Sequence, residues 1–161
     1  MAKSGEATAE RPNIIFIITD QMRGDCLSVT GHPVVRTPHI DSIAHGGVAF
    51  TAAYSPCPSC IAARASIFTG LLPMQHGAQS DPASENRSLS YGVRPLAESF
   101  TTLAELLRGA GYRTGAVVGG PALRREFGVA QGFERYDDSL ESLRDRVHGR
   151  RADQVSAGAI A

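Results

Sequence analysis

The 161-residue chain lacks the features that mark several classes of protein. Sixteen lysine and arginine residues balance sixteen acidic residues, so no net charge favours binding to nucleic acid or to an acidic membrane surface. The longest purely apolar run, residues 14–18, is only five residues long, whereas a transmembrane helix needs about 20 apolar residues. The sequence therefore predicts a protein with no nucleic-acid partner and no membrane partner.

Cysteine is also scarce. Cys26, Cys57 and Cys60 are too few and odd in number for a disulfide framework, which favours a reducing compartment or a cysteine retained for chemistry. Residues 1–11 contain no apolar stretch of signal-peptide length. We therefore expect a cytoplasmic protein.

The composition is that of a globular protein, with 42% hydrophobic and 20% charged residues. Residues 1–12 are predicted to be a flexible polar tail ahead of a globular part at residues 13–161. Residues 13–19 form a β-branched apolar block typical of a strand inside a parallel sheet. Asp20 and Gln21 follow at the carboxyl end of this strand, which is where such sheets bind ligands.

The rest of the pattern alternates helices and strands. Helices are predicted from Thr37 and Pro38 to residues 46–47, at 60–68, from Thr101 or Thr102 to residues 109–111, and at 150–161. Strands are predicted at 48–54 and 112–118. Residues 71–98 are predicted to be a long surface loop, and residues 128–138 are predicted to be irregular. This order predicts an α/β protein, a layered sheet with helices on both faces. Three strands are few for such a sheet, which usually has about 5–6, so we expect a truncated part of a larger protein.

The segment at residues 60–70 carries the most chemical information. If Cys60 opens a helix, the backbone N–H groups and the helix dipole favour a thiolate there and any oxyanion bound beside it. Arg64 follows four residues later on the same helical face, where its guanidinium can hold an anionic substrate or the group at position 60. Two alternatives remain: a buried structural cysteine, and a redox pair or half of a zinc site formed by Cys57 and Cys60.

The same segment resembles the signature of the formylglycine-dependent sulfatases. Cys60, Ala62, Arg64, Thr69 and Gly70 occupy the positions of the signature residues. Further segments are similar to that family in the same order, at residues 11–21, 37–50, 102–114 and 132–137. The resemblance implies that residues 13–161 are the N-terminal part of a sulfatase catalytic domain with an alkaline-phosphatase-like α/β fold, incomplete because the chain is truncated.

The resemblance also implies a mechanism. In this family the signature cysteine is converted to formylglycine, so Cys60 would be the substrate of a maturation enzyme and the precursor of the nucleophile. The hydrated aldehyde attacks sulfur with one hydroxyl, and the other hydroxyl later releases sulfate. Arg64 would orient the hydrated aldehyde. A divalent cation, usually Ca²⁺ with Mn²⁺ or Mg²⁺ as alternatives, would be bound by Asp20 and by the modified Cys60 and would neutralise the sulfate oxygens.

Three further residues are candidates for contact with the substrate. Gln21 follows the metal-binding aspartate, as in some members of the family. His76 and Asn86 lie in the long predicted loop, where they could line a substrate cleft.

These features predict an enzyme that hydrolyses small-molecule sulfate esters, with the truncated chain inactive alone. One alternative keeps the fold and changes the substrate to a phosphate ester, as in a phosphonate monoester or phosphodiester hydrolase. The other alternative is a non-catalytic or redox protein that uses Cys57 and Cys60.

Overall fold

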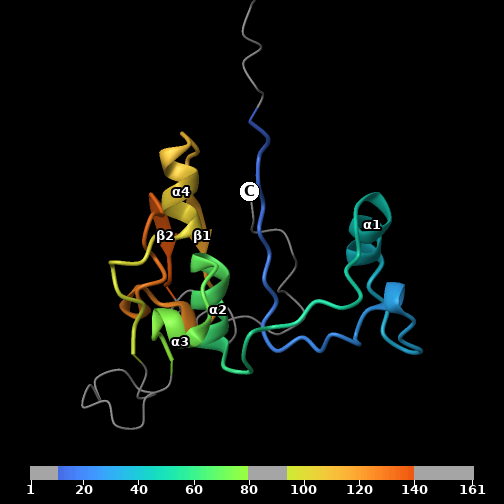
Figure 1. Ribbon diagram of the computed structural model, residues 1–161. Helices are drawn as coiled ribbons and strands as arrows, with labels where there is room; N and C mark the ends of the chain where they lie inside the picture. Colours follow the sequence, from blue (N-terminus) through green and yellow to red (C-terminus); the bar gives the residue numbers. More distant parts are fainter. Residues whose placement is uncertain (1–10, 80–93, 140–161) are drawn as a thin grey trace, which may run out of the picture. The chain divides into compact units, whose positions relative to one another are not determined.

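The computed structural model describes residues 11–79 and 94–139 of the chain (Figure 1). They belong to two compact units, one within residues 1–51 and the other within residues 52–161, and each unit is described by itself. Most of the predicted tail and the predicted helix at 150–161 lie outside the described residues. Within the described ranges, no helix combines the length and the apolar character that crossing a bilayer requires.

The first unit contains the 3-10 helix η1 (Ser28–Thr30) and the helix α1 (Pro38–Gly46). The predicted start of α1 is confirmed, with Pro38 at the first helical position, where the N–H that proline lacks would have no partner inside the helix. The hydroxyl of Thr37 accepts a hydrogen bond from the Ser28 N–H at 3.0 Å and donates to Oδ1 of Asp41 at 2.8 Å. These contacts join η1 to the first turn of α1.

Two predicted strands are wrong. Residues 13–19 and 48–54 belong to no β-ladder in the described part of the chain, and the side chains from Ile14 to Ile18 are 37–84% exposed. A strand is stabilised by hydrogen bonds to a neighbouring strand and by burial of its apolar faces. A β-branched composition alone provides neither a neighbouring strand to pair with nor other elements to bury the apolar faces.

The second unit combines short helices with a small sheet (Figure 1). Its elements are α2 (Cys60–Thr69), α3 (Pro73–His76), α4 (Leu103–Gly109), β1 (Gly115–Val117), η2 (Pro121–Leu123), η3 (Arg125–Phe127) and β2 (Arg135–Asp137). The predicted helices at 60–68 and after Thr102 are confirmed, and β1 lies inside the strand predicted at 112–118.

The strands β1 and β2 pair in parallel, with Gly115 opposite Arg135 and Val117 opposite Asp137. Parallel strands need a crossover connection, and η2 and η3 lie within it. The prediction of irregular chain at 128–138 is wrong at β2. This strand has no apolar run, because exposed charged residues flank the half-buried Tyr136.

The core of the second unit is built on α2. One buried cluster consists of Ile61, Phe127 and Val129, and a second consists of Ala65, Ala78 and Leu96. The prediction of a surface loop over residues 71–98 is therefore wrong in part, since α3, Ala78 and Leu96 belong to this packed region. The small side chains of α2 let neighbouring segments approach the helix closely.

The helix α4 begins with a capping box. The Glu105 N–H donates to Oγ1 of Thr102 at 3.2 Å, and the Thr102 N–H donates to Oε2 of Glu105 at 2.7 Å. Thr102 is only 1% exposed and also donates from its hydroxyl to the carbonyl of Gln131 at 3.0 Å. The start of α4 thus holds the turn that leads into β2.

Candidate active site

Cys60 is the first residue of α2 and is exposed. The preceding residue, Ser59, is extended (φ −78°, ψ 122°), and its carbonyl accepts the Ala63 N–H at 2.9 Å, which starts the helical ladder. The N–H groups and the positive end of the helix dipole favour an anionic group at this position. The predicted helix start at Cys60 is therefore confirmed.

The end of α2 is set by two residues that also belong to the recognised sequence signature. Thr69 donates from its hydroxyl to the Ala65 carbonyl at 2.7 Å, and Gly70 adopts a left-handed conformation (φ 71°) while its N–H donates to the Ser66 carbonyl. A left-handed glycine is a common way to end a helix. These residues therefore fix the length of the helix whose first residue is Cys60.

Arg64 lies one helical turn after Cys60 and is only 9% exposed. The two residues, which we expected on one helical face, thus differ in environment, since Cys60 is exposed to solvent and Arg64 is buried. Removing a guanidinium from water is costly, so its burial here is a specific feature of the site. Arg64 and the helix dipole give the first turns of α2 two sources of positive potential.

His76 lies in α3 and is 3% exposed. Its Nδ1 accepts the Ala78 N–H at 3.0 Å, so Nε2 carries the ring hydrogen and donates to Oγ of Ser66 at 2.9 Å. Burial lowers the pKa of His76, and a hydrogen bond to the Ala62 backbone opposes this effect in part. A neutral imidazole therefore joins α3 to α2.

This placement differs from the exposed loop position expected for His76. No short sequence pattern points to Ser66 as its partner, because the two residues are ten positions apart and meet only through helix packing. Contact of His76 with a substrate stays a prediction, and Asn86 lies outside the described residues.

Asp20 and Gln21 belong to the first unit, where both are exposed. Gln21 has a φ of +54°, a left-handed conformation that is uncommon for a residue other than glycine. Backbone conformations of this kind cluster at binding and catalytic sites. The turn that carries the predicted metal ligand is thus conformationally unusual.

The two predicted metal ligands, Asp20 and Cys60, both lie among the described residues. Within residues 11–79 and 94–139, no three His, Cys, Asp or Glu side chains gather into a cluster that could hold a metal ion. The carboxylate of Asp20 is the kind of hard ligand that Ca²⁺ prefers, but Ca²⁺ takes about 6–8 oxygen ligands. Asp20 therefore fits the role of one ligand among several.

The cysteines are all free thiols in this structure. The Sγ of Cys57 donates to the Ser59 carbonyl at 3.5 Å, and no disulfide joins it to Cys60. This arrangement leaves the Cys60 side chain available for modification.

Comparison with known proteins identifies the family. The Sulfatase family profile matches residues 12–151. An arylsulfatase from Clostridium perfringens is 52% identical over 67 residues, which cover 42% of this chain and 14% of that protein. Arylsulfatase A from Bos taurus is 39% identical over 112 residues, which cover 70% of this chain and 21% of that protein. The chain belongs to the sulfatase family.

The likeness extends to solved structures. The crystal structure of the phosphonate monoester hydrolase of Agrobacterium radiobacter superposes with a TM-score of 0.63 at 32% identity, covering 86% of this chain and 29% of that chain. The predicted α/β fold of the alkaline-phosphatase type is thus confirmed in incomplete form. The chain spans only 14% and 21% of the lengths of the two arylsulfatases. Sulfatases generally use formylglycine and a divalent cation.

Proposed function

We propose that the protein encoded by the complete reading frame hydrolyses sulfate esters of small molecules and that Cys60 is the residue converted to formylglycine. One observation carries this proposal: in a chain of the sulfatase family, the signature cysteine is the exposed first residue of a helix. A helix N-terminus favours the anion that an ester of this kind presents.

The residues have distinct roles in this proposal. Cys60 would be modified by a maturation enzyme, and the hydrated aldehyde would supply a hydroxyl that attacks sulfur. Buried Arg64 adds a fixed positive charge one turn along the helix. Asp20 would be one ligand of a divalent cation, with Ca²⁺ as the first candidate, and the cation would neutralise charge on the sulfate oxygens.

The test compares cysteine variants in the product of the complete reading frame, expressed together with a formylglycine-generating enzyme. Hydrolysis of p-nitrophenyl sulfate should be lost in Cys60→Ala and retained in Cys57→Ala, which is the matched control three residues away. Intact mass should fall by about 18 Da through conversion at Cys60. Full activity in Cys60→Ala would refute the assignment of the nucleophile.

A second candidate function is hydrolysis of a phosphonate monoester or phosphodiester. It is favoured by the structural likeness to the phosphonate monoester hydrolase, which covers 86% of this chain. Both functions would use Cys60 in the same way, so the substrate must separate them. A higher kcat/KM for p-nitrophenyl phenylphosphonate, a phosphonate monoester with the same leaving group, than for p-nitrophenyl sulfate would favour the second function.

A further inference from the structure

The segment that supports the first turn of α2 comes from the crossover between β1 and β2. Ile61, next to Cys60, is 7% exposed and belongs to one buried cluster with Phe127 and Val129, each 1% exposed. Phe127 is the last residue of η3, so this 3-10 helix reaches the residue that follows Cys60. The position of η3 therefore influences the position of the start of α2.

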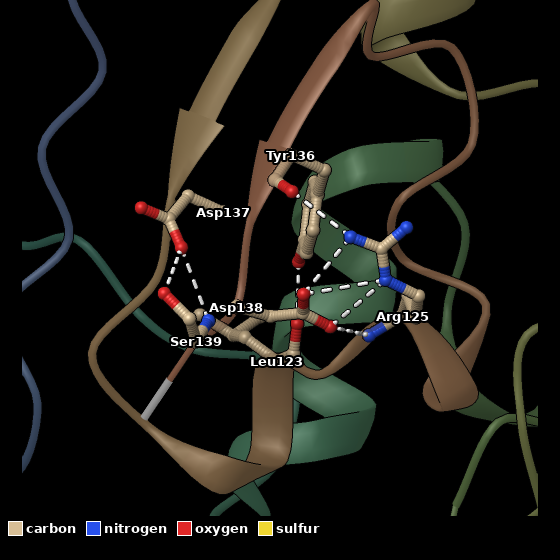
Figure 2. Close-up of polar contacts among 6 residues, drawn as sticks. All are labelled: Leu123, Arg125, Tyr136, Asp137, Asp138 and Ser139. Atoms are coloured by element: carbon tan, nitrogen blue, oxygen red, sulfur yellow. Dashed lines mark hydrogen bonds and ion pairs between the residues drawn. The ribbon is translucent and has the colours of Figure 1, made fainter. Parts of the chain in front are cut away.

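An ion pair joins η3 to the residue after β2. Figure 2 shows the guanidinium of Arg125 against the carboxylate of Asp138. Nη2 of Arg125 donates to Oδ1 of Asp138 at 3.0 Å, and Nε lies 3.2 Å from both carboxylate oxygens. The Arg125 N–H, at the start of η3, donates to Oδ2 at 3.0 Å. One carboxylate thus binds both the side chain and the backbone of Arg125.

Tyr136 adds three contacts to this arrangement. Nη2 of Arg125 donates to the Tyr136 carbonyl at 3.0 Å, and the guanidinium lies 6.0 Å from the centre of the Tyr136 ring. The Tyr136 hydroxyl donates to the Leu123 carbonyl at the end of η2 (Figure 2). Burial raises the pKa of Tyr136 to about 12, so this hydroxyl keeps its proton at neutral pH. The end of η2 and the start of η3 are therefore both held by contacts with β2 and the residue that follows it.

We propose that Arg125 and Asp138 are positioning residues for Cys60, because their ion pair holds η3 where Phe127 packs on Ile61. The proposal rests on the function proposed above for Cys60. It assigns neither residue a contact with the substrate. Bidentate geometry suits such a role, since it fixes orientation as well as distance.

The first test is hydrogen exchange of the backbone amides in the product of the complete reading frame. Arg125→Met keeps an unbranched stem and removes the guanidinium. We expect exchange in α2 to become about tenfold faster or more, with exchange in α4 unchanged. The control is Arg113→Met, which removes an ion pair with Glu134 (3.9 Å) at the other end of the same two strands and should leave both helices unchanged.

The second test is the kinetics of the same variants. A displaced Cys60 should lower kcat for p-nitrophenyl sulfate by about 10- to 100-fold with KM little changed, and Arg125→Lys should recover part of the loss. Asp138→Asn, which retains an acceptor for the Arg125 N–H, provides a second variant should Arg125→Met fail to fold.

The outcomes separate this proposal from the proposed function. Unchanged exchange in α2, equal acceleration in α2 and α4, or faster exchange in α2 with unchanged kcat would each overturn the positioning role. An unmutated protein without hydrolytic activity would instead refute the proposed function, while the exchange pattern would still decide whether the ion pair holds α2.

Discussion

Gly128 provides a strong test of how the core holds the candidate active site. It follows Phe127 with a φ of +76°, and a Cβ at this position would clash with the backbone of Leu96, lying 3.0 Å from its carbonyl carbon and closer still to its oxygen. The Leu96 N–H also donates to the Phe127 carbonyl at 3.0 Å. Gly128→Ala must therefore disturb both the backbone conformation and the contact with Leu96.

Gly70 is the matched control, because it has a similar φ of +71° but no atom within 4 Å of the position of a Cβ. Gly70→Ala should cost about 1 kcal/mol, the penalty for a left-handed alanine. In Gly128→Ala the steric clash adds about 1–3 kcal/mol. Loss of the hydrogen bond between Leu96 and Phe127 adds about 1 kcal/mol. The total of about 3–5 kcal/mol is a large part of the usual stability of a domain, about 5–15 kcal/mol.

Urea denaturation followed by far-UV circular dichroism measures both variants against the unmutated protein. We expect a clearly larger fall in the unfolding free energy for Gly128→Ala than for Gly70→Ala. Equal, small losses would show that the chain accommodates a side chain beside Leu96, and the described packing of the crossover would then be wrong.

Three further outcomes are expected. The pKa of the His76 imidazole is lower in the folded protein than in the unfolded chain, where it is near 6.5, so the free energy of unfolding should fall as the pH drops below that value. The fall in the urea midpoint from about pH 8 to about pH 5 should be smaller in His76→Asn than in the unmutated protein. Equal falls in the two proteins would contradict this role of His76. Thr102→Ala should cost about 1–2 kcal/mol in urea denaturation and Thr102→Ser much less, because the serine hydroxyl can still cap α4; equal costs would argue against the cap. In the product of the complete reading frame, removal of divalent cations with EDTA should abolish hydrolysis of p-nitrophenyl sulfate, and added Ca²⁺ should restore it. Asp20→Asn should weaken Ca²⁺ binding measured by calorimetry. Full activity in EDTA would exclude the proposed cation.

The helices α1, α2 and α4 were predictable from sequence because their ends are specified locally, whereas α3 lies in a segment predicted to be a loop. Pro38 begins α1, Thr102 and Glu105 form the capping box of α4, and Gly70 ends α2 in a left-handed conformation. Each signal acts within a few residues, so it can be read without knowledge of distant contacts.

The strands were predicted less well because pairing depends on distant residues. The apolar block at 13–19 has the composition of a strand but no ladder partner among the described residues, whereas β2 (Arg135–Asp137) is a strand without an apolar run. Arg135 pairs with Gly115, twenty residues earlier, and composition does not specify such a partner. The ion pair between Arg125 and Asp138 was missed for the same reason.

The candidate site shows the same division between local and distant information. The sequence predicted Cys60 at the start of a helix and Arg64 one turn later, but the burial of Arg64 depends on what packs around α2. Thr69 and Gly70, which accompany Cys60 in the family signature, make contacts that end this helix. The signature therefore specifies a helix of defined length together with a reactive residue. A change at its packing positions should alter the placement of Cys60 even where the cysteine itself is intact.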